Sequence, residues 1–193
     1  MNQESMNIED FVDQLTTNPW ISEEDEEKGS RYQQYTIRAR RVLHQKYKIL
    51  ENIVSIKQKS QLFCIPGNYD MDLRFTSLHL RDLHLKCHEV RGLKFAGYGG
   101  ADVWTPGIPQ RYIVPYRAGV GMNYADNEMY NFFKKTSPDI IVTHQPAHGI
   151  HDRVTQFGTS GSPSLRHYCD NHKVLMCLTG HIHMDWGFQA AED

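Results

Sequence analysis

The sequence lacks any hydrophobic run of the roughly 20 residues that a membrane-spanning helix needs. Its first residues, MNQES, have neither the basic nor the apolar region of a secretory signal. We therefore expect a soluble, cytoplasmic protein without a membrane partner. The four cysteines contain no Cys-x-x-Cys pair, and Cys64 and Cys177 lie within apolar runs. Free, buried thiols are predicted, because nothing in the sequence points to an oxidising compartment.

An excess of charge of one sign is also absent, since 21 Lys and Arg nearly balance 23 Asp and Glu. A formal net charge of −2 gives no electrostatic reason to expect nucleic acid as a partner. The basic residues between positions 38 and 48 lie on a predicted helix, and no interleaved platform of stacking aromatics accompanies them, so we interpret them as a solvated face. Residues 1–30, with the acidic run at residues 23–27, are predicted to be loosely held. A chain of 193 residues that is 39% hydrophobic predicts one domain spanning residues 1–193.

The pattern of apolar and turn residues predicts alternating helices and strands. Apolar residues recur at intervals of three and four over residues 31–59, which indicates an amphipathic helix. Two further helices are predicted at residues 123–136 and 162–172, the second with Pro163 at its first position. Short apolar runs predict strands at residues 61–66, 83–90, 93–98, 139–143 and 174–178. This alternation predicts an α/β fold, in which functional sites collect at strand ends.

Three of the predicted strands end in turns that carry a potential metal ligand. The last strand leads into Gly-His-x-His, which places His181 and His183 on one rigid turn. Asn68 lies in a Gly-Asn turn after the strand at residues 61–66, and His144 follows the strand at residues 139–143. Each of these residues alone is more typical of an ordinary loop. The ordered set predicts a metal site.

The three turns also resemble the motifs of a known family. Gly-Asn-Tyr-Asp at residues 67–70, His-x-Pro at 144–146 and Gly-His-x-His at 180–183 occur in the order found in calcineurin-like metallophosphoesterases. The resemblance covers about residues 60–190 and is closest to small bacterial and archaeal phosphoesterase-like proteins. It implies a four-layer α/β/β/α sandwich with two metals at the sheet edge, and hydrolysis of phosphomonoesters or phosphodiesters.

The resemblance also assigns roles to individual residues. Asn68, His144 and His181 would bind one divalent metal, and His183 would bind the other, with manganese, iron and zinc all suited to such ligands. The three histidines would be the catalytic residues. Apart from the family's roles, contacts to a small phosphate-ester substrate are predicted for Asn68, Tyr69 and His148. The alternatives are that Tyr69 only fills the space of the family's histidine and that His148 is an ordinary exposed loop residue.

Several departures from the family pattern predict reduced activity. Tyr69 stands where the family has a histidine, and a phenol with a pKa near ~10 is a poorer acid at neutral pH. No Gly-Asp dipeptide occurs in the sequence, and we interpret the Asp-x-His at residues 82–84 as unrelated to the family's motif because it follows the Gly-Asn turn. Relative to the family, the sandwich looks incomplete at both ends. Exposed sheet edges would then be covered by a second copy or by a partner chain.

Two alternatives to a working phosphoesterase stay open. The missing carboxylates and Tyr69 favour a catalytically inactive module that uses the same fold for binding or interaction. A mononuclear metal protein without phosphate chemistry would use the same four ligands, Asn68, His144, His181 and His183.

Overall fold

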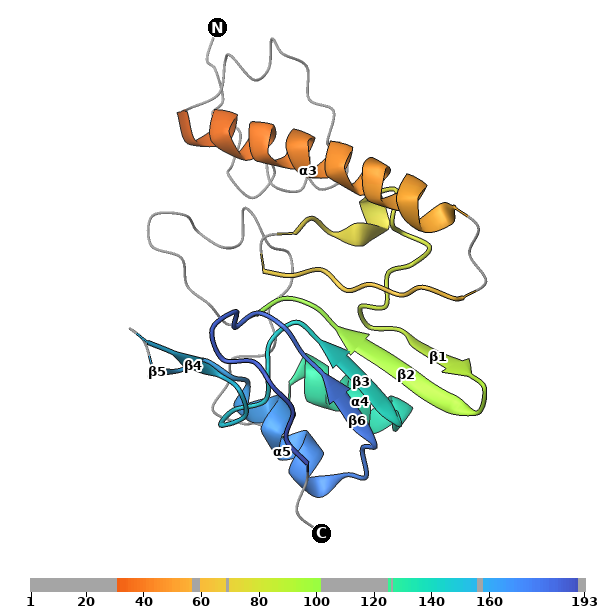
Figure 1. Ribbon diagram of the computed structural model, residues 1–193, viewed down its shortest axis with the longest axis vertical. Helices are drawn as coiled ribbons and strands as arrows, with labels where there is room; N and C mark the ends of the chain where they lie inside the picture. The colour runs from red at the N-terminus through yellow and green to blue at the C-terminus, as the bar shows by residue number, and fades with distance from the viewer. Residues whose placement is uncertain are drawn as a thin grey trace, which may run out of the picture.

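A computed structural model describes residues 31–56, 60–68, 70–101, 125, 127–155 and 158–190, and within them a mixed sheet forms the centre of the fold (Figure 1). Its four strands have the order β1-β2-β3-β6. They are β1 (Cys87–Val90), β2 (Leu93–Tyr98), β3 (Ile140–Thr143) and β6 (Met176–Leu178). β1 is antiparallel to β2, whereas β2, β3 and β6 run parallel, so β3 and β6 end at the same edge. A separate two-stranded sheet joins β4 (Arg153–Val154) to β5 (Gly158–Thr159).

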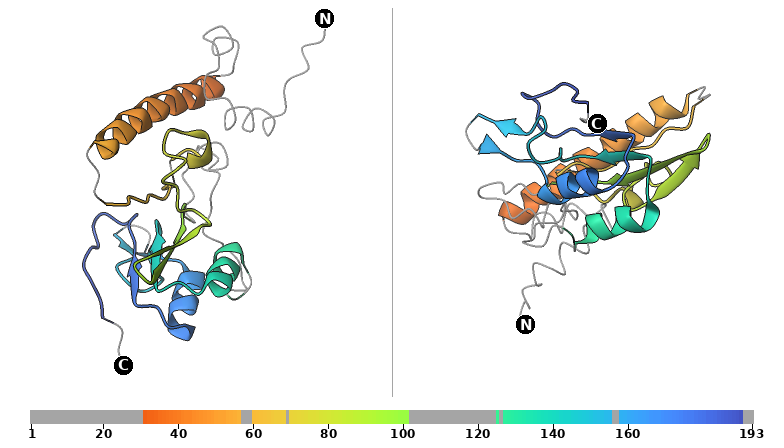
Figure 2. Two further views of the ribbon diagram at one scale, coloured as in Figure 1. Left: turned by 90° about the vertical axis from the view of Figure 1, so that its right-hand side faces the viewer. Right: turned by 90° about the horizontal axis from the view of Figure 1, so that it is seen from below.

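Two helices, α4 (Glu128–Thr136) and α5 (Pro163–Asn171), cover one face of the central sheet (Figure 2). In β3 it is Ile141 that points toward them and is fully buried, as strand alternation requires. The main core lies between this sheet face and the two helices and contains Ala96, Tyr98, Met129, Tyr130, Phe133, Ile141, Ala147, Leu165 and Tyr168. This core fixes the strands whose ends carry the predicted ligands.

Local sequence signals explain where these elements begin and turn. The Asn127 side chain accepts a hydrogen bond from the Tyr130 N–H at 2.9 Å and caps α4. The Ser162 hydroxyl caps α5 in the same way, at 3.2 Å from the Leu165 nitrogen. Arg91 and Gly92, with φ of 53° and 80°, form the two-residue turn between β1 and β2.

The longest helix, α3 (Arg31–Ser55), lies away from the central sheet (Figure 1). The chain from residue 60 to residue 82, with the 3-10 helix η1 (Leu73–Phe75), passes between them. Tyr47 of α3 is buried with Met71, Leu73 and Leu78 in a second hydrophobic cluster. The helix is therefore attached to the segment that carries the Gly-Asn turn.

The α/β fold expected from the sequence is confirmed, with differences at particular segments. The predicted strand at residues 61–66 is wrong, because only Cys64 forms a β-bridge, with Asp82, and Pro66 has no N–H to donate. The strand expected from residue 83 begins at Cys87, since Leu85 has a φ of 54°, which a strand does not accommodate. The helix expected from residue 123 begins at Glu128, after its cap. Residues 1–30 lie outside the described part, and one domain for residues 1–193 stays a prediction.

The other face of the sheet is less covered. At β6, the strand at the edge of the described sheet, Met176 and Leu178 are about half exposed. Beyond it, Trp186 and Phe188 are 84% and 95% exposed. None of the helices in the described ranges is both long enough and apolar enough to cross a bilayer.

Candidate metal centre

His144 lies at the end of β3, where the backbone joins it to both neighbouring strands. Its N–H donates to the Tyr98 carbonyl at the end of β2, with 3.4 Å between the two atoms. Its own carbonyl accepts the Gly180 N–H at 2.9 Å. The parallel register thus brings the turn after β6 directly beside His144.

Asn68 lies in a turn between Gly67 and Asp70 that a carboxylate closes. Asp70 Oδ2 accepts the Gly67 N–H at 2.6 Å, and the Asn68 residue is only 7% exposed. A β-carbon at Gly67 would lie 3.1 Å from His144 Cε1 and 3.2 Å from His144 Nε2. A side chain at position 67 would therefore require the His144 ring to shift by a few tenths of an ångström.

His181 follows Gly180 and has a left-handed backbone, with a φ of 72°. Such a conformation is uncommon for a residue with a side chain and is concentrated at functional sites. It directs the His181 ring to the His144 ring, with 4.9 Å between the centroids and 66° between the planes.

Three side-chain donor atoms converge at this point. Asn68 Oδ1 lies 3.0 Å from His144 Nε2, and His144 Nε2 lies 3.1 Å from His181 Nδ1. Two atoms that each lie about 2.1 Å from one ion are about 3.0 Å apart at the 90° angle of octahedral coordination and about 3.4 Å apart at the tetrahedral angle that zinc prefers. The observed separations therefore match those of neighbouring ligands around a single ion.

Hydrogen bonding alone does not satisfy the three atoms. An amide oxygen only accepts, and an imidazole nitrogen carries at most one proton. One proton on His144 Nε2 would have to serve both Asn68 and His181, whereas a proton on His181 Nδ1 would leave the amide oxygen facing a lone pair. A cation in contact with all three atoms would accept one lone pair from each of them.

The protonation of the two rings also suits a metal. Burial, reinforced by the positive charge that His144 and His183 can carry, lowers the pKa of His181 to about 4. Burial likewise lowers the pKa of His144, although the Asp70 carboxylate opposes part of this effect. Both rings are therefore neutral at pH 7 and present lone pairs, as metal ligation requires.

The donor set is limited to one amide and two imidazoles. In the part of the chain that the structure describes, no three His, Cys, Asp or Glu side chains are grouped so that they could hold a metal. The residues fit a single ion with three protein ligands and water in the open positions. The ligand roles of Asn68, His144 and His181 stay a prediction.

The other predicted site residues lie outside this convergence or outside the described ranges. His183 is exposed, and its charge contributes to lowering the pKa of both His144 and His181. The His148 side chain is 50% exposed, with Nδ1 at 3.5 Å from Asp152 Oδ2. Asp152 is buried and accepts the N–H groups of Gly149 and Gly161, so it holds this loop closed. Tyr69 lies outside the described residues.

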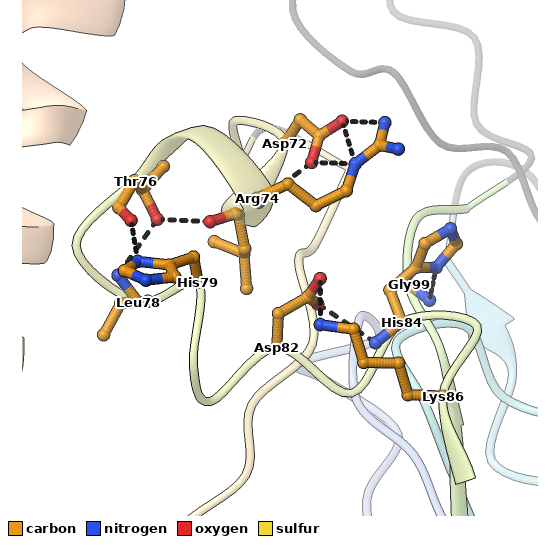
Figure 3. Close-up of polar contacts among 10 residues, drawn as sticks. Asp72, Arg74, Thr76, Leu78, His79, Asp82, His84, Lys86 and Gly99 are labelled. Carbon is orange, nitrogen blue, oxygen red and sulfur yellow. Dashed lines mark hydrogen bonds and ion pairs between the residues drawn. The ribbon is translucent and has the colours of Figure 1, made fainter.

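The Asp-x-His at residues 82–84 belongs to a buried polar cluster beside η1 (Figure 3). Asp82 accepts the His84 N–H at 3.0 Å, and His84 Nδ1 accepts the Gly99 N–H at 2.9 Å. Burial lowers the pKa of His84 to about 4. These bonds give Asp82 and His84 a structural role, in agreement with the interpretation from the sequence.

Sequence reasoning missed one contributor to the site. No role for Asp70 beyond its place in the Gly-Asn-Tyr-Asp motif was predicted, yet its Oδ1 accepts a hydrogen bond from the Tyr47 hydroxyl of α3. The two residues are 23 positions apart, and no local motif joins them. Tyr47 lies within the helix predicted over residues 31–59, but nothing in its sequence context points to Asp70.

Comparison with known proteins identifies the family of the chain. Residues 30–185 match the calcineurin-like phosphoesterase family, a range that contains all three converging residues. No curated protein and no solved structure matches the chain. Because the match spans most of the sequence, the chain belongs to the calcineurin-like phosphoesterase family.

Proposed function

We propose that this chain is a metal-dependent phosphoester hydrolase in which Asn68, His144 and His181 hold a divalent cation. The observation that carries the proposal is the convergence of Asn68 Oδ1, His144 Nε2 and His181 Nδ1 at spacings of 3.0 and 3.1 Å. A bound divalent ion would neutralise phosphoryl oxygens and lower the pKa of a coordinated water. Amide and imidazole ligands suit manganese, iron or zinc.

The charge of the donor set bears on what the site would bind. Asn68 is a neutral amide, and the lowered pKa values of His144 and His181 keep both rings uncharged at pH 7. Three uncharged ligands leave the positive charge of a cation available to attract a phosphate group. This arrangement favours a phosphate ester as the substrate.

Further residues would act on the substrate side. His183 is exposed next to the converging rings, so it is available to a phosphate or to a second ion. We assign substrate contacts to Asn68, Tyr69 and His148, of which His148 is half exposed. An open depression of about 500 Å³ is lined by the β4–β5 pair and by Met184 and Asp185, which directly follow His183. It offers space for the alcohol portion of a small ester.

We expect slow turnover. The sequence has no Gly-Asp dipeptide to supply a bridging carboxylate, and it has a tyrosine in place of the family's histidine at position 69. A single ion with three neutral ligands would polarise the ester and activate water. Without a bridging carboxylate, a second ion that would stabilise the leaving oxygen, as in two-metal sites, would be held only weakly.

The test is hydrolysis of p-nitrophenyl phosphate and of bis(p-nitrophenyl) phosphate, with manganese, iron(II) or zinc supplied. Metal-dependent release of nitrophenol is expected, and His181→Ala should abolish it. His79→Ala is the matched control, because His79 is an exposed histidine whose Nδ1 bonds to the Thr76 carbonyl. Equal turnover by His181→Ala, or no turnover by the folded chain with any of the three metals, would contradict the proposal.

A catalytically inactive interaction module is the second candidate. The exposed apolar side chains near the C-terminus, Met184, Trp186 and Phe188, support it, because large exposed apolar groups close together are typical of interaction surfaces. Metal binding without turnover, together with self-association that Trp186→Ser abolishes in analytical ultracentrifugation, would favour this function over hydrolysis.

A further inference from the structure

A tyrosine of the long helix α3 is hydrogen-bonded to the turn that carries Asn68. The Tyr47 residue is 7% exposed, and its hydroxyl donates to Asp70 Oδ1 at 2.5 Å. The same hydroxyl oxygen accepts the Met71 N–H at 3.1 Å. Tyr47 therefore fixes both the side chain of Asp70 and the backbone that follows it.

The Asp70 carboxylate transmits this contact to the start of the turn. Its other oxygen, Oδ2, accepts the Gly67 N–H at 2.6 Å, and the Asp70 N–H donates to the Gly67 carbonyl at 3.4 Å. Asn68 lies between the two residues that these bonds connect. Rotation of the carboxylate would break its hydrogen bond to the Gly67 N–H, and the Asn68 side chain would then no longer be held in one direction.

We propose that Tyr47 is a positioning residue for the metal centre, acting through Asp70 to hold Asn68 Oδ1 against the His144 ring. The inference rests on the proposed metal site and deepens it by making α3 part of the site's architecture. Ligands in metal sites are commonly oriented by an outer shell of hydrogen bonds, and losing such a partner typically weakens metal binding by about 10- to 100-fold.

The competing explanation is that Tyr47 contributes only packing. Its ring belongs to the cluster with Met71, Leu73 and Leu78, and phenylalanine would preserve those contacts. Tyr47→Phe therefore removes the hydroxyl and keeps the ring, so it distinguishes the two explanations. Tyr168→Phe is the matched control, because Tyr168 is also buried and its hydroxyl donates to the Phe133 carbonyl at 3.0 Å within the core between α4 and α5.

The experiment is calorimetric titration of the full chain and both variants with Zn²⁺ and Mn²⁺, with urea unfolding measured in parallel. Tyr47→Phe should bind metal at least about 10-fold more weakly than the unmodified chain, whereas Tyr168→Phe should bind as the unmodified chain does. Asp70→Asn, which removes one of the two strong acceptors, should weaken binding in the same direction. In the absence of metal, amide hydrogen exchange at Met71 and Gly67 should accelerate in Tyr47→Phe.

The failures of the two proposals are distinguishable. If the unmodified chain binds neither metal, the proposed function fails, and the positioning role fails with it. If the unmodified chain binds metal and Tyr47→Phe binds it equally well, only the positioning role is overturned. Equal weakening in Tyr47→Phe and Tyr168→Phe would also overturn it, because the effect would then reflect general loss of stability.

Discussion

Replacing Gly67 by alanine tests how closely the ligand turn must approach His144. The added β-carbon would lie 3.1 Å from His144 Cε1 and 3.1 Å from Asp70 Oδ2, closer than ordinary van der Waals contact. Neither neighbour is a free side-chain end, because His144 contacts Asn68 and His181, and Asp70 accepts two hydrogen bonds. The His144 ring must therefore move by a few tenths of an ångström.

The expected magnitudes differ for stability and for metal binding. Alanine restricts the unfolded chain and would stabilise the protein by about 0.4–1 kcal/mol, while crowding of a packed site costs about 1–3 kcal/mol. The net loss in the free energy of unfolding should therefore lie between about 0 and 2.6 kcal/mol. Metal ligands tolerate displacements of only about 0.2 Å, so the affinity for zinc or manganese should fall by about 10-fold or more.

Gly180→Ala is the control, because Gly180 also adjoins a ligand in sequence. Its β-carbon would approach no closer than 3.6 Å, to the His144 carbonyl oxygen, which is an ordinary contact. Calorimetry and urea unfolding should show near-normal metal affinity and stability for this variant. If Gly67→Ala binds metal as tightly as Gly180→Ala, the close approach of the turn to His144 is not needed for the site.

Three further predictions concern the scaffold. The folded pKa of His84, about 4, lies below the unfolded value of 6.5, so only the unfolded chain gains this proton between those values. The free energy of unfolding should therefore fall by up to about 3 kcal/mol as the pH drops from 6.5 to 4. His84→Asn keeps an acceptor for the Gly99 N–H, and in urea unfolding it should remove this part of the pH dependence. Asp152→Ala leaves the N–H groups of Gly149 and Gly161 without their acceptor and should lower the free energy of unfolding by about 3 kcal/mol in urea titrations. Asp152→Asn keeps one acceptor oxygen and should recover part of this stability. Phe133→Ala should lower the free energy of unfolding in urea by about 3–5 kcal/mol because the ring is fully buried. Phe188 is 95% exposed, so Phe188→Ala should change it by less than about 0.5 kcal/mol. Similar losses in the two variants would contradict the assigned core.

Much of the fold could be predicted because capping and turn residues in the sequence coincide with the ends of helices and strands. Ser162 and Pro163 mark the start of α5, and Arg91-Gly92 marks the turn between β1 and β2. The strands β3 and β6 were predicted from short apolar runs, and both are followed by a histidine turn. In a parallel sheet, these two turns must lie at one edge, which is why the approach of His144 to His181 followed from the pattern.

The remaining features depend on tertiary contacts that no local pattern contains. The segment at residues 61–66 is apolar like a strand, but Cys64 makes only a single bridge, to Asp82. The burial of His84 and its bond to the Gly99 N–H depend on a loop returning beside it. The bond between Tyr47 and Asp70 joins a helix to a turn 23 residues away. Such contacts are decided by packing, which sequence periodicity does not specify.

The most direct test of the metal centre is calorimetric titration of the unmodified chain and of His144→Ala with zinc and manganese. His144 Nε2 is the atom within 3.1 Å of both other donors, so its loss removes the common member of the set. Saturable binding of one ion by the unmodified chain, abolished in His144→Ala, is the predicted result. Equal binding by the two proteins would show that Asn68, His144 and His181 do not form a metal centre.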